Sequence, residues 1–178
     1  MRIHAFQAGT ETISGLVCFG SMFKSLGSKI ILCSLVCMLL GTASGLLTVT
    51  GVTSWYATIQ KPSWNPPNWI FGPVWTLLYL LMGASFAMAW HKGGQDGRRM
   101  MQLFGVQFFL NLLWSPIFFY FHQVGWALVV IAALWILLFL TILAAGRVRP
   151  LAAWFLVPYI SWVSFAMLLN ATIWWLNR

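Results

Sequence analysis

Charged side chains are scarce in this chain of 178 residues. They make up 7% of the residues, against about 25% in an ordinary soluble domain, while 61% of the chain is apolar and the mean hydropathy is +0.84. Twelve charged side chains cannot cover the surface of a soluble monomer of this length. Disorder is excluded as well, because disordered chains are poor in apolar and aromatic residues. The composition therefore predicts a membrane protein.

Acids and cysteines are scarce as well. Glu11 and Asp96 are the two acids, and Cys18, Cys33 and Cys37 are the three cysteines. No cysteine and histidine have the spacing of a zinc site, and neither a carboxylate pair nor a Ser-His-Asp set is available. Hydrolytic and metal-dependent chemistry therefore have no support. The ten basic residues form no stripe, so nucleic acid is not expected as a partner.

Five apolar stretches reach the length of about 20 residues that a transmembrane helix requires. They are residues 30–51, 69–90, 101–121, 126–145 and 151–176. We expect an all-α membrane protein, a five-transmembrane-helix bundle over residues 28–178, after a poorly ordered extension over residues 1–27. The first stretch also has the layout of a signal peptide. Its apolar character continues to a spanning length, which favours a retained helix.

The basic residues predict the orientation of the bundle, because they concentrate on the cytoplasmic side of membrane proteins. Eight lie on the amino-terminal side: Arg2, Lys24, Lys29, Lys92, Arg98, Arg99, Arg147 and Arg149. Lys61 and Arg178 lie on the opposite side. The N-terminus is therefore expected in the cytoplasm. No charged residue falls within the five stretches, which argues against a transporter coupled to ions or protons.

Tryptophan is unusually abundant, with 12 residues. Near the outer ends of the stretches lie Trp55, Trp64, Trp69, Trp126, Trp174 and Trp175; near the inner ends, Trp90 and Trp154; and deeper, Trp75, Trp114, Trp135 and Trp162. A belt of interfacial aromatic residues would populate both sides of the membrane. The excess on one side predicts an aromatic-lined cavity that opens toward the outer side or is capped from it.

The connection over residues 52–68 joins the first two stretches. Its three prolines exclude a continuous helix. Its aromatic side chains, Tyr56 and Trp64 among them, would be costly to leave in water. The connection is therefore expected either to fold back as a rigid lid over the helix ends or to anchor the chain in the membrane interface.

Three later stretches carry residues that share one helix face. The sets are Trp75, Tyr79, Met82 and Phe86; then Gln107, Asn111 and Ser115, with Trp114 beside them; then Trp162, Ala166 and Asn170. The aromatic face serves packing, lipid contact or a cavity. The amide stripe is either hydrogen-bonded glue between helices or the polar wall of a cavity. Ala166 leaves a notch for a neighbouring helix or a flat ligand.

Proline and glycine add two expectations about the helices. Pro158 lacks an N–H inside the last stretch, so that helix should kink or free a carbonyl group. Gly41 with Gly45, and Gly83 with Ala87, form small-residue pairs that permit close contact between helices.

Several long runs of residues have an order that is typical of a known protein family. They are WYA at 55–57, QKPSWNPPNW at 60–69, FGPVWTLLY at 71–79, Gln107 with NLLWSPIFF at 111–119, GWAL at 125–128 and PYISW at 158–162. This order closely resembles that of the tryptophan-rich sensory protein family, to which the mitochondrial translocator protein, formerly the peripheral benzodiazepine receptor, belongs. The resemblance covers all five stretches.

The resemblance implies a five-helix bundle, commonly a homodimer, with a pocket under the first connection. Members of the family bind porphyrins, and many bind sterols, benzodiazepines and isoquinoline carboxamide drugs. Carried over by motif, with Tyr79 added from the aromatic face, the pocket residues are Tyr56, Trp64, Trp75, Tyr79, Gln107, Asn111, Trp114, Trp162 and Ala166. No cofactor is required, and the expected ligand is a porphyrin such as protoporphyrin IX or a haem-like molecule.

The function that the resemblance implies is that of a sensory or regulatory membrane protein that binds a tetrapyrrole. One alternative is a light-dependent enzyme that degrades protoporphyrin with the help of Trp75 and Trp162. The other is a transporter of porphyrins or sterols.

The carboxyl end departs from the animal members of the family. Their cholesterol-recognition segment contains a tyrosine, and residues 168–178 of this chain contain none. Such motifs are weak even when complete, so specific handling of cholesterol is not expected. A bacterial member in the inner membrane is expected, with the outer membrane as the alternative.

Overall fold

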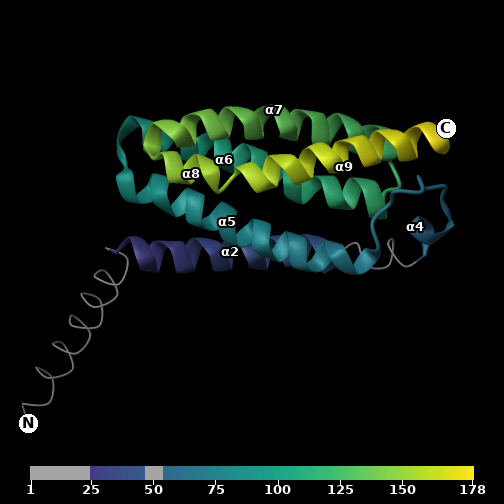
Figure 1. Ribbon diagram of the computed structural model, residues 1–178, viewed down its shortest axis with the longest axis horizontal. Coiled ribbons are helices and arrows are strands. Elements are labelled where there is room, and N and C mark those ends of the chain that lie inside the picture. The colour runs from purple at the N-terminus through teal and green to yellow at the C-terminus, as the bar shows by residue number, and fades with distance from the viewer. Residues whose placement is uncertain (1–24, 47–53) are drawn as a thin grey trace, which may run out of the picture.

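The computed structural model describes residues 25–46 and 54–178, and the long helices of this part of the chain lie lengthwise in one bundle (Figure 1). The spans are α2 (Leu26–Leu46); η1 (Asn68–Ile70) with α5 (Phe71–Lys92); α6 (Gly94–Ser115) with the π-helical turn η2 (Pro116–Tyr120); α7 (Val124–Val148); and α8 (Pro150–Trp154) with α9 (Val157–Leu176). Each span is long and apolar enough to cross a membrane. The predicted all-α bundle of five transmembrane helices is confirmed.

The helices pack in a definite order. α2 packs mainly against α5, α6 against α7, and α7 against α9, while the short α8 contacts α7 and α5. A further short helix, α4 (Trp55–Thr58), lies in the first connection. Figure 1 places α4 and the C-terminus at one end of the bundle and α8 near the other. We call these ends the α4 end and the α8 end.

Close contact between α2 and α5 depends on Gly83. A Cβ atom at this position would overlap the backbone of Ser34 on α2. The Ser34 hydroxyl donates a hydrogen bond to the carbonyl of Leu80 at 2.9 Å. Small residues and hydrogen bonds of this kind hold helices together in lipid, where apolar side chains alone give no preference for a neighbouring helix.

Two helices begin well before their apolar stretches. α2 begins at Leu26, since the Oγ of Ser25 accepts a hydrogen bond from the backbone N–H of Ser28 at 3.1 Å and caps the helix. α6 begins at Gly94, well before the apolar stretch that starts at residue 101. The first turns of α6 are helical but polar, so hydropathy does not reveal them.

The expected extension over residues 1–27 falls almost wholly outside the described residues. Leu26 and Gly27, at its end, belong to α2. The expected end of the first helix at residue 51 also lies outside the described part of the chain.

Pro116 ends the regular hydrogen bonding of α6. Proline has no N–H to give to the carbonyl of Leu112, four residues earlier. That carbonyl accepts a hydrogen bond from the hydroxyl of Ser44 on α2 at 2.7 Å instead. The chain then passes through the π-helical turn, in which Phe121 N–H donates to the Pro116 carbonyl at 3.0 Å.

The last span is broken rather than merely bent at Pro158. α8 ends at Trp154, and Pro158 stands in the first turn of α9. Near the break, the carbonyl of Ala152 accepts a hydrogen bond from the Ser85 hydroxyl of α5 at 2.7 Å. The sequence predicts a kink or a freed carbonyl group at Pro158. In the structure the span consists of two helices, and the Ala152 carbonyl near the break accepts its hydrogen bond from α5.

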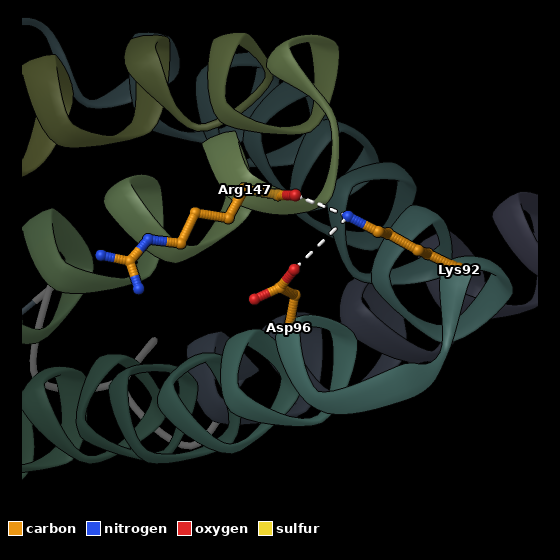
Figure 2. A network of polar contacts seen from close by, with 3 residues as sticks. All are labelled: Lys92, Asp96 and Arg147. Carbon is orange, nitrogen blue, oxygen red and sulfur yellow. Dashed lines mark hydrogen bonds and ion pairs between the residues drawn. The ribbon is translucent and has the colours of Figure 1, made fainter.

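The α8 end of the bundle is tied by a small polar network (Figure 2). The Nζ of Lys92, at the end of α5, donates a hydrogen bond to the Arg147 carbonyl at 2.6 Å and lies 3.6 Å from Oδ2 of Asp96. The Lys92–Asp96 pair is largely exposed and contributes little to stability. Through these two contacts Lys92 joins the end of α5 to the start of α6 and to the end of α7.

Candidate ligand cavity under the first connection

A cavity of about 450 Å³ lies toward the α4 end of the bundle. This volume is within the range of about 300 to 1,000 Å³ that is usual for small-molecule sites. Residues of α2, α4, η1, α5, α6, η2 and α9 line it. Among the described residues, no charged side chain lines the cavity.

Seven of the nine predicted site residues line this one cavity, namely Tyr56, Trp75, Tyr79, Asn111, Trp114, Trp162 and Ala166. The other two do not. Trp64 is 43% exposed and contacts the edge of Phe165 at 5.8 Å between ring centres. Gln107 is fully buried and is not among the residues that line the cavity.

Flat aromatic faces form two walls. On α5, the rings of Trp75 and Tyr79 are stacked with 5.3 Å between their centres and an angle of 25° between their planes. On α9, the ring of Trp162 meets the edge of Phe71 at 5.8 Å. Gly41 of α2 lets the Tyr79 ring lie close, because a Cβ atom there would overlap that ring.

A buried polar cluster lies beside and behind these walls. The Tyr79 hydroxyl donates a hydrogen bond to Oδ1 of Asn111 at 3.3 Å, and the Tyr159 hydroxyl donates to Oε1 of Gln107 at 3.1 Å. The Nε2 of Gln107 has no hydrogen-bond partner in the described part of the chain. The predicted amide stripe therefore divides: Asn111 and Ser115 line the cavity, and Gln107 joins α6 to α9.

Trp114 is fixed in the wall by its indole N–H. This group donates a hydrogen bond to Oδ1 of Asn170 at 3.1 Å, and Nδ2 of Asn170 donates to the Val124 carbonyl at 2.9 Å. One buried amide thus connects α6, α7 and α9. Of the predicted set on α9, Trp162 and Ala166 face the cavity while Asn170 serves helix packing.

The first connection, residues 54–68, contributes a lid. Tyr56 is buried and lines the cavity, and its hydroxyl donates a hydrogen bond to Oδ1 of Asn65 at 2.7 Å. Burial raises the pKa of the Tyr56 phenol above its ordinary value, and the hydrogen bond to Asn65 opposes this rise. The phenol is therefore neutral near pH 7 and acts as a donor.

The lid and the interfacial anchor are both found in the connection, but in different residues. Tyr56 and Asn68 face the cavity, as a lid requires. Trp64 is 43% exposed, as an interfacial anchor requires. Sequence composition could not separate these residues, because the lid and the anchor use the same aromatic side chains.

Besides the contact between Trp64 and Phe165, two further contacts hold the lid. The side chain of Asn177, after α9, is hydrogen-bonded to the backbone of Gln60. The ring of Trp55 is stacked on that of His122, between η2 and α7, with 4.4 Å between their centres. Both contacts join the lid to segments that are distant in sequence.

The α2 wall of the cavity was missed by sequence reasoning. It consists of Met38, Gly41, Thr42, Ser44, Gly45 and Leu46. The sequence signal is the small-residue pair of Gly41 and Gly45, which predicts a helix contact. Spacing alone does not tell whether a small face meets another helix or a cavity, and in this chain Gly41 meets the Tyr79 ring at the cavity wall.

The fold and cavity define a class: an integral membrane protein of five helices with an aromatic cavity beneath a loop lid. The sequence model described as the TspO/MBR family matches residues 33–176, and the chain belongs to this family. The predicted resemblance is confirmed.

Several relatives are similar over most of their length. The tryptophan-rich protein TspO of Chlorobaculum tepidum is 43% identical over 148 residues, which are 82% of this chain and 94% of that protein. The translocator protein of Homo sapiens is 42% identical over 123 residues, 67% of this chain and 73% of that protein. Protein CrtK of Rhodobacter capsulatus is 37% identical over 126 residues, 70% of this chain and 79% of that protein.

Proposed function

We propose that this membrane protein is sensory or regulatory and binds a tetrapyrrole, such as protoporphyrin IX, in the cavity under the lid. The observation that carries the proposal is a cavity of about 450 Å³ with aromatic faces on α5, α6 and α9 and no charged side chain among its described lining residues. Membership of the TspO/MBR family supports the same function.

The chemistry of the walls suits a flat aromatic macrocycle. Aromatic rings stack with an offset and gain about 0.5 to 1.5 kcal/mol per pair beyond the burial of their area. Trp75 and Trp162 offer such faces from two different helices, and Ala166 leaves space one turn beyond Trp162. Binding by stacking needs no acid, base or metal ion.

A titration with protoporphyrin IX tests this proposal. Tryptophan emission of the purified protein should be quenched to saturation. Replacing Trp75→Ala together with Trp162→Ala should weaken binding by about tenfold or more, because two stacking faces are lost. The control is Trp154→Ala, a side chain that is 68% exposed and outside the cavity lining. Unchanged affinity in the double variant would contradict the proposed site.

The same two indoles support a second candidate function, light-dependent oxidation of the bound porphyrin. An excited porphyrin can take an electron from an indole and pass it to dioxygen, which forms superoxide. The indole then recovers its electron from the porphyrin, so the porphyrin is oxidised and dioxygen is reduced. The test is the consumption of more than one porphyrin per protein under light and oxygen. A loss equal to that in a detergent blank would contradict this function.

The cavity end of the bundle is proposed to face away from the cytoplasm. In the described part of the chain, the basic residues at the α8 end are Lys29, Lys92, Arg98, Arg99, Arg147 and Arg149, whereas Lys61 and Arg178 belong to the α4 end. Basic residues collect on the cytoplasmic side. In a variant whose three native cysteines are replaced, a cysteine introduced at Arg178 should be labelled by an impermeant reagent on intact cells. Labelling only after lysis would contradict this orientation.

A further inference from the structure

In the described part of the chain, the α8 end of the bundle carries a large surplus of positive charge. Asp96, the acid of this part, lies 3.6 Å from Nζ of Lys92 and offsets that cation. The other basic residues of the α8 end are Lys29, Arg98, Arg99, Arg147 and Arg149. Nζ of Lys29 lies over the ring of Trp90 at 4.8 Å. Arginines therefore carry most of the surplus.

The guanidinium groups of these arginines are almost unused within the protein. Arg99, Arg147 and Arg149 are exposed, and their guanidinium groups have no hydrogen-bond or ion-pair partner among the described residues. Nε of Arg98 makes one contact of 3.4 Å, with the Gly94 carbonyl of its own helix. A guanidinium group has five N–H donors. The α8 end thus offers many charged donors to a molecule outside the chain.

Lys92 brings these arginines together from two helices (Figure 2). Its Nζ contacts both Asp96, in the first turn of α6, and the carbonyl of Arg147, near the end of α7. In Figure 2 the guanidinium group of Arg147 points away from Lys92. The start of α6 and the end of α7 are therefore neighbours, and their arginines belong to one surface.

The cations of the α4 end are placed differently. Nζ of Lys61 donates a hydrogen bond to the Tyr56 carbonyl at 2.6 Å, and the guanidinium group of Arg178 lies over the ring of Trp175 at 3.4 Å. The protein itself holds both of these groups. Unused guanidinium groups are thus a property of the α8 end and not of every exposed cation in the described part of the chain.

The arginines lie at the depth at which a phospholipid carries its phosphate. Arg98 and Arg99 precede the apolar stretch of α6, which starts at residue 101, by about 3 to 5 Å along the helix. Trp90 and Trp154 are 38% and 68% exposed at the same end. Exposed indoles lie at the boundary between hydrocarbon and headgroups. The guanidinium groups just beyond this boundary therefore meet the headgroups.

We propose that the α8 end binds the headgroup of an anionic phospholipid, with Arg99, Arg147 and Arg149 donating to its phosphate oxygens. The planar fork of a guanidinium group matches the geometry of a phosphate group. The acyl chains of this lipid lie along the apolar surface, where Leu151 and Trp154 of α8 are exposed. A zwitterionic lipid has the same phosphate but adds a cation, which the arginines repel. The surface is separate from the cavity, so this inference does not rest on the proposed function.

The test is native mass spectrometry of the protein released from nanodiscs that hold equal amounts of phosphatidylglycerol and phosphatidylcholine with the same acyl chains. The unaltered protein should retain phosphatidylglycerol in preference. Arg147→Gln together with Arg149→Gln should lower this preference by about tenfold or more, because each basic residue near an anionic surface strengthens the attraction about fivefold. Arg147→Lys together with Arg149→Lys, which keeps the charge, should retain most of the preference.

Lys61→Gln together with Arg178→Gln is the matched control. It removes the same charge from the chain, but at the α4 end, and should leave the preference unchanged. Added sodium chloride should weaken the retention of phosphatidylglycerol by the unaltered protein, because salt screens exposed charges.

Three results would overturn the inference. The first is equal retention of the two lipids by the unaltered protein. The second is an equal loss of preference in the two glutamine double variants, because net charge alone would then explain it. The third is displacement of phosphatidylglycerol by inorganic phosphate more effectively than by chloride at the same ionic strength, because the surface would then bind free anions. Porphyrin takes no part in these measurements, so failure of the proposed function would leave them unaffected.

Discussion

Asn177 and Gln60 are joined by a pair of hydrogen bonds across 117 positions of sequence. The backbone N–H of Gln60 donates to Oδ1 of Asn177 at 2.9 Å, and Nδ2 of Asn177 donates to the Gln60 carbonyl at 2.9 Å. The Asn177 side chain also donates to the Ile173 carbonyl at 2.8 Å, which fixes it on the last turn of α9. The end of the chain thus holds the middle of the lid.

Loss of this pair should loosen the lid. We expect Asn177→Ala to speed the hydrogen exchange of the Gln60 amide by about tenfold and to speed ligand release, because a hydrogen bond contributes about 0.5 to 1.5 kcal/mol. The control is Thr172→Ala, whose hydroxyl is bonded only to its own helix at the Leu168 carbonyl. Unchanged exchange at Gln60 in Asn177→Ala would show that the lid is held elsewhere.

Ala166 should control the space of the cavity. Its side chain lines the cavity one turn beyond Trp162. We expect Ala166→Leu to lower porphyrin affinity by about tenfold or more, because the larger side chain would occupy space that a ligand needs. Ala166→Gly, which keeps that space, should bind normally. Isothermal titration of both variants checks this, and equal affinity in the two would contradict it.

Gly83 should be essential for the packing of α2 on α5. Gly83→Ala places a Cβ atom against the Ser34 backbone, which cannot move as a flexible side chain can. We expect a loss of about 1 to 3 kcal/mol in the free energy of unfolding, as for other overpacked positions. Gly105→Ala is the control, since a Cβ atom there meets no atom within 4 Å. Equal unfolding midpoints of the two variants in detergent would contradict the expectation.

Gln107 and Tyr159 should be coupled energetically. Tyr159→Phe leaves the Gln107 amide without its hydroxyl donor, and its Nε2 already lacks a partner among the described residues. An unsatisfied buried polar group costs about 1 to 3 kcal/mol. The double variant with Gln107→Leu should therefore be more stable than Tyr159→Phe alone. A double-mutant cycle measures the coupling, and strictly additive changes would argue against it.

The five spans follow from the sequence because twenty apolar residues have few alternatives to a helix in lipid. The exact ends of the helices do not follow from the sequence in the same way, because the first turns of α6, from Gly94, are polar yet helical. Hydropathy measures what lies in the membrane, whereas the helix ends where its hydrogen bonding ends. Ser25, as the cap of α2, is a local signal that could have been used.

Part of the cavity could be predicted from the sequence. Spacing placed Gln107 and Asn111 on one face of α6, but they lie one turn apart in depth, and Asn111 alone of the two reaches the cavity. The depth to which the cavity extends depends on how closely α5 and α9 approach each other. The sequence of one helix does not determine that distance. The α2 wall could not be predicted either, because a glycine is compatible both with a tight contact between helices and with the wall of a cavity.

The most direct test is a structure of the protein with protoporphyrin IX bound. The account predicts the macrocycle in the cavity under the lid, between Trp75 and Trp162. A macrocycle on the lipid-facing surface, with the cavity unoccupied, would contradict it.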